Sequence, residues 1–302
     1  MPQLVESCGM FFLCPFLPLP FPLFRFPRKK HAFLFCFVSD LCYLCSINQY
    51  TQLLQYQKYT QMRVLIVNTS EKTGGAAVAA NRLMDALNNN GVKAKMLVRD
   101  KETEDITVVS LPRSLRLQWN FLWERWCVFW HLHFSRQRLW EVDMATSGTD
   151  ITRLREFQEA DVIHLSWINQ GMLSLKNIRK IIRSGKPVVW TMHDLWPATG
   201  ICHYARGCNR YASACGNCPL LPNKGSKNDL SAKIFRRKKE LYHRGAISFV
   251  TCSRWLERQA KGSGLFVGQR ITNIPNPIDT HVFCPQDQAE ARLRAGLPAD
   301  KH

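Results

Sequence analysis

The chain has 302 residues, of which 46% are hydrophobic and 21% charged, a composition that excludes an intrinsically disordered protein. Its formal net charge of +18 favours acidic partners such as phosphates, nucleotides, anionic membranes or nucleic acid, without choosing among them. The twelve cysteines are unevenly placed and no convincing secretory signal accompanies them, so reduced thiols or a metal site are favoured over a disulfide framework.

Residues 1–61 differ in character from the rest of the chain. The apolar run 10–27 contains five prolines, which oppose a membrane-spanning helix, and it lacks the charged start and cleavage site of a signal peptide. A second apolar run, 31–47, carries Asp40 and is marginal as a membrane span. We predict that 1–61 is a poorly structured extension outside the fold, with a membrane anchor as the alternative.

From Met62 onward, short apolar strands alternate with helical patterns. This order predicts an α/β fold, a single Rossmann-like doubly wound parallel sheet with helices on both faces. In such sheets ligands bind beyond the carboxyl ends of the strands, so the residues that follow each strand are the candidates for function. The predicted strands are 63–68, 93–98, 161–167, 187–194, 246–252 and 270–276, and the predicted helices lie near 76–89, 115–134, 174–184, 229–243 and 253–261.

Two glycines, Gly74 and Gly75, follow the first predicted strand and lead into a helix. Paired glycines let the backbone approach a ligand closely, and a helix N-terminus offers free N–H groups to a phosphate. The pattern is not G-x-G-x-x-G, and no ribose-binding acidic residue follows the second strand, so a nicotinamide fingerprint is not met. Gly74 and Gly75 are candidate binding residues for a donor phosphate, with a plain tight turn as the alternative.

The segment 115–140 combines aromatic residues with arginines. On a helix this mixture suits a membrane interface, where rings lie among the headgroups and cations meet anionic lipid. It also suits stacking on single-stranded nucleic acid, and a third alternative is a core-packing helix whose arginines face water. The basic segment 233–244 would add to a lipid-facing patch or form a solvated helical face. The residues concerned are Trp119, Phe121, Trp123, Trp126, Phe129, Trp130, Phe134 and Trp140, with Arg113, Arg116, Arg125, Arg136 and Arg138.

His193 and Asp194 end the strand segment predicted at 187–194 and directly follow its apolar part, PVVWTM. A histidine at the carboxyl end of a strand is placed to act on a substrate as acid, base or oxyanion partner. Asp194 can orient a histidine or bind a sugar hydroxyl. Both are candidate catalytic residues; the alternative is a capping aspartate beside a structural histidine.

Four cysteines follow in the loop 200–222, namely Cys202, Cys208, Cys215 and Cys218. The closing C-x-x-C can hold one ion between two thiolates, and two further cysteines complete a tetrahedron. The loop is polar and rich in glycine, so a structural zinc would supply the stability that a small apolar core lacks. The alternatives are reduced thiols or transient disulfides, and His203 could replace one cysteine as a ligand.

Several segments taken together resemble family 4 glycosyltransferases, in particular the polysaccharide-building branch with an HD-x-W-P loop and a cysteine-rich insert. The stretch NIPNPIDTHVF at 273–283 resembles the segment that closes the first domain in that family. The other segments that carry the likeness are EADVIHLSWINQGMLSLKNI (159–178), KPVVWTMHDLWPATGICHYARGC (186–208), CGNCPLL (215–221) and TCSRWLERQ (251–259).

The resemblance implies a GT-B fold of two facing Rossmann-like domains, with 62–285 as the acceptor-side domain. Gly74 and Gly75 would lie near the donor phosphates, and His193 near the reacting sugar. The implied activity is retaining, hexosyltransferase-like transfer from a nucleotide sugar to a lipid-linked or saccharide acceptor in polysaccharide biosynthesis. The family works without a catalytic cofactor, so a zinc ion at the cysteines would be structural.

The sequence departs from the family pattern after residue 285. Residues 286–302 are expected to be the truncated start of a linker or second domain, and no two glutamates stand eight positions apart, as the donor-binding domain requires. We therefore expect the chain alone to be inactive. A different class is a non-catalytic, zinc-stabilised module that binds glycan or membrane. Nucleic acid is disfavoured because no reading motif is present, and we expect a cytoplasmic location or a peripheral one at the inner face of the membrane.

Overall fold

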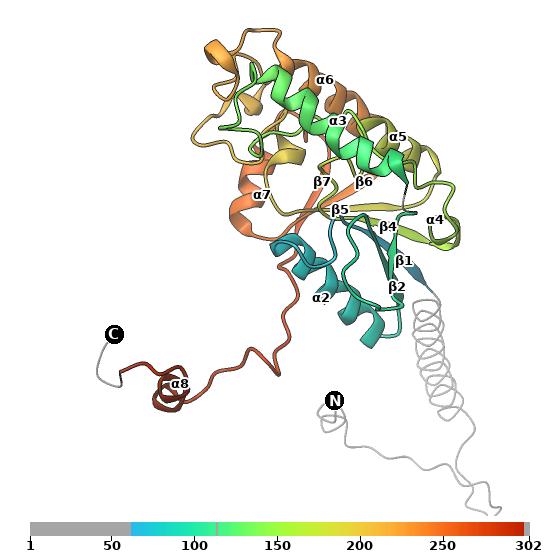
Figure 1. Ribbon diagram of the computed structural model, residues 1–302, viewed down its shortest axis with the longest axis vertical. Helices are drawn as coiled ribbons and strands as arrows, with labels where there is room; N and C mark the ends of the chain where they lie inside the picture. The colour runs from blue at the N-terminus through green and yellow to red at the C-terminus, as the bar shows by residue number, and fades with distance from the viewer. Residues whose placement is uncertain (1–61, 113, 299–302) are drawn as a thin grey trace, which may run out of the picture. The chain divides into compact units, whose positions relative to one another are not determined.

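The computed structural model describes residues 62–112 and 114–298, and the extension 1–61 lies outside them. Within the described residues, seven strands form one sheet in the order β3-β2-β1-β4-β5-β6-β7, and every neighbouring pair is parallel. The α/β Rossmann-like fold class is thereby confirmed (Figure 1). The strands are β1 (Arg63–Val67), β2 (Lys93–Val98), β3 (Val108–Ser110), β4 (Val162–Leu165), β5 (Val188–Met192), β6 (Ile247–Thr251) and β7 (Arg270–Asn273).

Helices cover both faces of the sheet. Figure 1 shows α3, α5 and α6 on one side of the sheet and α2 on the other. Most of these helices begin at a side chain that accepts a hydrogen bond from the first turn, such as Ser114, Ser174, Asp229 and Ser253. The helices are α2 (Gly75–Asn89), α3 (Leu115–His131), α4 (Arg155–Glu159), α5 (Leu175–Arg183), α6 (Leu230–His243), α7 (Arg254–Lys261) and α8 (Gln288–Arg294).

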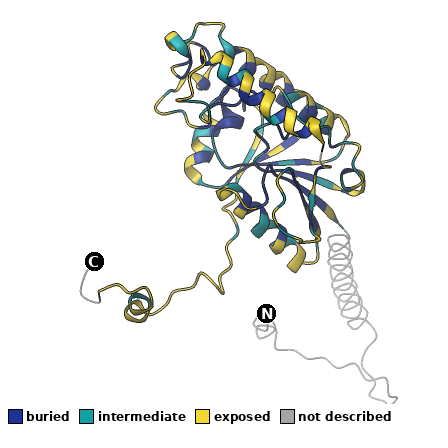
Figure 2. Ribbon diagram, viewed as in Figure 1, coloured by how far each residue is buried: buried dark blue, intermediate teal, exposed yellow. Residues whose placement is uncertain are grey.

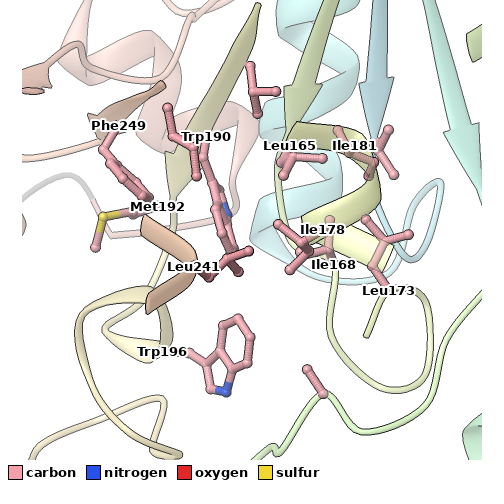
Figure 3. Packing of buried hydrophobic residues seen from close by; sticks show 14 of the residues in the cluster. Leu165, Ile168, Leu173, Ile178, Ile181, Trp190, Met192, Trp196, Leu241 and Phe249 are labelled. Carbon is pink, nitrogen blue, oxygen red and sulfur yellow. The ribbon is translucent and has the colours of Figure 1, made fainter. Parts of the chain in front are cut away.

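Alternate residues of β1 face two separate cores. Leu65 and Val67 of β1 belong to the large cluster that includes Ile178 of α5, while Ile66 belongs to the cluster that includes Met84 of α2. Because both faces of the strands are covered, the strands are buried almost throughout, as Figure 2 shows. Figure 3 shows the larger cluster.

Trp190 of β5 anchors this larger core. Its ring lies 6.2 Å from that of Trp196 and 5.8 Å from that of Phe249, and all three side chains are fully buried (Figure 3). Trp196 belongs to the loop that follows β5, so the loop carrying His193 and Asp194 is held to the core by a large aromatic contact.

The chain order places a switch point between β1 and β4. From β1 the chain moves outward through β2 and β3, then crosses back to β4 on the other side of β1. Ligands of open parallel sheets bind at such a point, beyond the carboxyl ends of the strands. Among the described residues, no helix is long and apolar enough to span a membrane.

Candidate functional site

One cleft lies at the carboxyl ends of β1, β4, β5 and β6, at the switch point of the sheet. Gly74, Gly75, His193 and Asp194 all line it, although more than a hundred residues separate the glycines from the histidine. The structure therefore brings together the four residues that the sequence singled out for catalysis and donor binding. The other lining residues are Asn68, Thr69, Ser70, Thr73, Ala76, Ala77, Asp100, Trp167, Gln170, Tyr204, Cys252 and Asn276.

The two glycines form the start of α2 and leave space beside it. Gly74 has φ 89°, in the left-handed region that other residues avoid, and its carbonyl accepts the N–H of Ala77 at 3.1 Å. A Cβ atom built on Gly74 or Gly75 meets no protein atom within 4 Å. The absence of side chains here does not serve internal packing. The N–H groups of Gly75 and Ala76 have no acceptor among the described residues, whereas that of Ala77 is bonded to Gly74.

His193 follows β5 and is held by a serine of the neighbouring strand end. Its Nε2 lies 3.0 Å from Oγ of Ser166, which follows β4. Burial lowers the pKa of His193, against an opposing effect of the adjacent Asp194 carboxylate, so the ring is neutral at pH 7. No hydrogen bond to Nδ1 is made by the described residues, so this atom is available to a ligand in the cleft.

Asp194 is engaged in three internal hydrogen bonds. Its carboxylate accepts the indole N–H of Trp167 at 3.0 Å and the backbone N–H of Trp196 at 2.8 Å. The third hydrogen bond joins the carboxylate to Nδ1 of His203, at 2.7 Å. The pKa of Asp194 is lowered, because these hydrogen bonds outweigh the opposing effect of burial. Asp194 thus positions the walls of the cleft, and a direct contact of its carboxylate with substrate stays a prediction.

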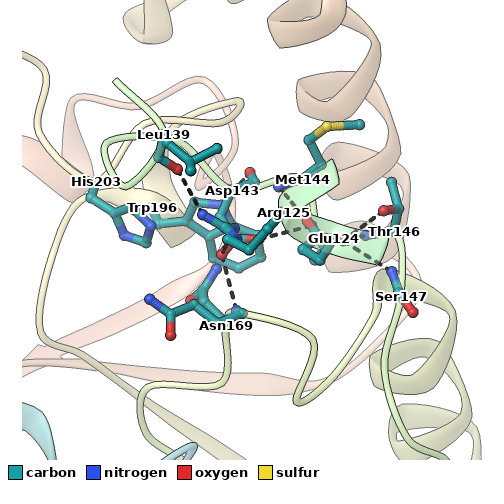
Figure 4. Close-up of polar contacts among 12 residues, drawn as sticks. Glu124, Arg125, Leu139, Asp143, Met144, Thr146, Ser147, Asn169, Trp196 and His203 are labelled. Carbon is teal, nitrogen blue, oxygen red and sulfur yellow. Dashed lines mark hydrogen bonds and ion pairs between the residues drawn. The ribbon is translucent and has the colours of Figure 1, made fainter. Parts of the chain in front are cut away.

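A buried polar network lies behind the cleft and joins it to α3 (Figure 4). Asp143 accepts a hydrogen bond from Arg125 of α3 at 2.9 Å and another from the backbone N–H of Gln170 at 3.0 Å. The backbone carbonyl of Asp143 accepts the indole N–H of Trp196 at 2.8 Å. The arginine beside Asp143 lowers the pKa of this fully buried carboxyl against the effect of burial. Gln170 lines the cleft, so the network ties α3 to the site.

The four cysteines of the loop 200–222 line one small cavity of about 20 Å³, enough for a single water molecule or ion. All four are free thiols, and Sγ of Cys215 accepts the N–H of Gly200 at 3.3 Å. Within residues 62–298, however, no three His, Cys, Asp or Glu side chains approach closely enough to count as a metal-binding group. The four cysteines therefore line one cavity but do not meet as a metal-binding group among the described residues, and zinc binding stays a prediction.

His203, the alternative ligand in place of one cysteine, is engaged elsewhere. Its Nδ1 is paired with Asp194, and its ring lies 5.8 Å from that of Trp167 at the cleft. The residue is absent from the lining of the cysteine cavity. The structure thus places His203 against Asp194 and Trp167, two residues that line the cleft, and not among the thiols.

Several cleft residues were not anticipated from the sequence. Trp167 and Gln170 line the cleft after β4, and Ser166 contacts His193 there. The predicted strand 161–167 ran on through Ser166 and Trp167 and stopped before Gln170. The signal that could have found them is the rule already used for β1 and β5, that the first polar residues after a strand lie at the ligand edge. Asn276 comes from the segment after β7 and carries no such local signal.

Comparison with known proteins identifies the family. The model of Glycosyltransferase Family 4 matches residues 73–282, more than half of the chain and a range that includes Gly74, Gly75 and His193. The chain is also 32% identical over 85 residues to a protein named putative colanic acid biosynthesis glycosyl transferase WcaC, from Escherichia coli strain K12. That similarity covers 27% of this chain and only 20% of the relative. On the match to the family model, this chain belongs to Glycosyltransferase Family 4.

Proposed function

We propose that the cleft is the acceptor side of a sugar-transfer site in polysaccharide biosynthesis. There a sugar passes from a nucleotide-activated donor to a saccharide or lipid-linked acceptor, with retention at the anomeric carbon. Membership of the family supports glycosyl transfer, and the name of the relative WcaC supports the link to polysaccharides. The donor's nucleotide would be held mainly by a second Rossmann-like domain, as the family resemblance implies.

The observation that carries the proposal is the meeting of Gly74, Gly75 and His193 in one cleft at the switch point. The start of α2 offers N–H groups and the positive end of a helix dipole to a diphosphate. The open space beside both glycines accommodates phosphate oxygens without displacing protein atoms. His193 lies across the same cleft, where a sugar attached to that diphosphate would extend.

His193 contributes a neutral imidazole whose orientation is set by Ser166. With Nε2 engaged by the serine hydroxyl, Nδ1 is the ring atom left to accept a hydrogen bond from a sugar hydroxyl or to donate one, depending on the tautomer. The lowered pKa keeps the ring uncharged near neutral pH, so it does not need to lose a proton before acting as an acceptor.

The phosphate part of the proposal is tested by a pair of substitutions at Gly75. Gly75→Asp places a negative charge in open space at the first position of α2, where it does not disturb packing. We expect it to abolish binding of a nucleoside diphosphate, measured by saturation-transfer NMR on the full chain, because two like charges would meet. Gly75→Asn adds the same volume without the charge and should weaken binding much less. Equal loss in both variants would contradict phosphate binding at this loop.

The sugar-transfer part is tested at His193. In an enzyme that combines this chain with a family 4 donor-binding domain, His193→Ala should lower kcat by a factor on the order of 10²–10⁴. The melting temperature should change little, since the ring makes one hydrogen bond. Unchanged turnover in this variant would contradict the role of His193. If the combined enzyme without the substitution binds the diphosphate but transfers no sugar, the chain is a binding module and not part of an enzyme.

A further inference from the structure

Helix α3 presents the reverse of the usual distribution of polar and apolar residues. Its inward face carries Asn120, Glu124 and Arg125, all buried. Its outward face carries Trp119, Trp123, Trp126 and Trp130, whose exposed fractions lie between 44% and 60%. A helix that only covers a soluble core has its aromatic residues inside and its charges outside.

The inward polar residues are held by neighbouring backbone and side chains, as Figure 4 shows for Glu124 and Arg125. Glu124 accepts the N–H groups of Met144 at 2.9 Å and Thr146 at 2.8 Å. Arg125 donates to the carbonyl of Leu139 at 2.7 Å and to Asp143. Because these contacts fix the rotation of α3 about its axis, the outward position of the tryptophans is a built feature of the fold.

The four outward tryptophans form one row along the helix. At 100° per residue they fall within an arc of about 60°. Trp119 and Trp123 stack at 6.2 Å, and the row continues through Phe134, whose ring lies 5.3 Å from Trp130 and 6.4 Å from Trp126. A contiguous exposed apolar surface of this kind marks an interaction site on a soluble domain.

Charge favours a negatively charged partner for this surface. From Leu115 to Trp140 the only acidic residue is Glu124, and it is fully buried. Arg116 and Arg136 are exposed beside the tryptophan row. Helix α6 packs against the same cluster as α3, through Ile234 and Val128, and exposes further cations. These are Lys233, Arg236, Arg237, Lys239 and Arg244.

We propose that the outward face of α3 docks on an anionic lipid bilayer, with the four tryptophans among the headgroups and the cations of α3 and α6 against lipid phosphates. Indole rings are amphipathic and concentrate at the membrane interface, and arginine and lysine stems reach headgroups beside them. The proposal rests on the surface of α3 and does not depend on the chemistry assigned to the cleft.

The same features disfavour two other occupants. A second copy of the chain would bring two basic faces together without an exposed acidic residue between Leu115 and Trp140 to pair them. Single-stranded nucleic acid needs free ring faces for its bases, whereas Trp119 and Trp123 already stack on each other and Phe134 sets its ring edge-to-face with Trp130.

The test is sedimentation of the full 302-residue chain with vesicles of phosphatidylcholine and phosphatidylglycerol in equal parts, compared with phosphatidylcholine alone. The parent should bind the mixed vesicles and release at high salt. The variant W119S/W123S/W126S/W130S should lower partitioning at least about tenfold, because binding scales with the apolar area inserted. The parent and the tryptophan variant both retain residues 1–61, so any contribution of that segment to vesicle binding cancels in the comparison.

A matched control removes four exposed apolar residues elsewhere. The variant I106S/W255S/V267S/L297S replaces side chains that are at least half exposed on other elements, and its partitioning should stay within about twofold of the parent. The charge-reversal variant R116E/R136E leaves the buried face of α3 unchanged and should weaken binding to mixed vesicles. Circular dichroism shows whether the fourfold tryptophan variant folds. If it does not, binding of R116E/R136E to mixed vesicles decides whether the proposal holds.

Three results would overturn the proposal. One is that the parent does not bind mixed vesicles, or that the tryptophan variant binds as well as the parent. Another is light scattering that shows a dimer of the parent and a monomer of the tryptophan variant, without vesicle binding. The third is binding of the parent to a single-stranded oligonucleotide that competes with vesicles and depends equally on the four tryptophans. Stronger quenching by brominated lipids of the parent's tryptophan fluorescence than of the variant's would support it.

Discussion

His164 lies in β4 beneath the cleft and is buried as a neutral ring. Its Nε2 contacts Oγ1 of Thr191 at 2.8 Å, and its Nδ1 is buried without a partner among the described residues. Burial, with a smaller contribution from nearby His193, lowers the pKa of His164 to about 4. A protonated ring at this position would be an unpaired charge in the core.

The lowered pKa of His164 predicts a loss of stability in acid. Between pH 6.5 and 4 the unfolded chain binds a proton at this residue and the folded chain does not, so the free energy of unfolding falls as pH falls. The expected slope from this residue is at most about 1.4 kcal/mol per pH unit. The free energy of unfolding, measured by urea denaturation at several pH values, should fall more steeply with decreasing pH in the parent than in His164→Gln. Parallel curves would show that His164 titrates alike in both states.

Asp194 is the residue on which the wall of the cleft depends. Asp194→Ala would leave the N–H groups of Trp167 and Trp196 and the ring of His203 without their acceptor. We expect a loss of unfolding free energy on the order of 3 kcal/mol in urea denaturation. Glu257→Gln breaks an exposed pair with Lys261 and should cost less than about 0.5 kcal/mol. Similar costs in the two variants would refute the structural role of Asp194.

At the scale of elements, the cysteine loop packs Ile201, Leu220 and Leu221 into the cluster shared with α3 and α6, and its four thiols line one cavity. Burial raises the pKa of Cys202 to about 11 and of Cys215 to about 12, so the unliganded thiols are protonated and unreactive at neutral pH. A divalent ion would favour the thiolates, and the ammonium of Lys238, buried nearby, would offset part of their charge.

This loop gives a direct prediction of metal content. The chain purified from zinc-containing medium should carry about one zinc per molecule by mass spectrometry of the metal, and Cys215→Ser should release it and loosen the loop while the sheet stays folded. Cys284→Ser, at an exposed position away from the cavity, is the control and should retain the metal. Metal-free protein in which all twelve cysteines titrate as thiols after unfolding would leave a thiol-lined cavity and no ion site.

Helix α3 shows what an element's sequence does not reveal about its orientation. The mixture of aromatic residues and arginines left membrane, nucleic acid and core packing as alternatives. The deciding contacts are between Glu124 and the backbone N–H groups of Met144, Thr146 and Ser147. Those groups come from a loop without regular structure, so no periodicity in the sequence points to them.

At the scale of the whole molecule, the sheet could be predicted because its strands are short apolar runs that end in polar residues. Strand β2 matches its prediction, and the other predicted strands differ by one to three residues added at an end. Strand β3 and helix α4 were missed since Val108–Ser110 and Arg155–Glu159 are too short to show a period. The cleft was half predicted, because residues after β1 and β5 follow a local rule and Asn276 does not.

The position of β1 has a consequence for how the chain is made. β1 is the first of the described strands to be synthesised, yet in the sheet it lies inside, between β2 and β4. Its second partner, β4, is translated much later. Just beyond the ends of these two strands, the N–H of Thr69 donates to the carbonyl of Trp167 at 2.8 Å, a bond that can form only after β4 has been made. Until then the nascent β1–β2–β3 unit exposes an unpaired apolar edge, and such edges recruit other chains. The order of the strands therefore leaves one edge of β1 unpaired during synthesis until β4 has been made.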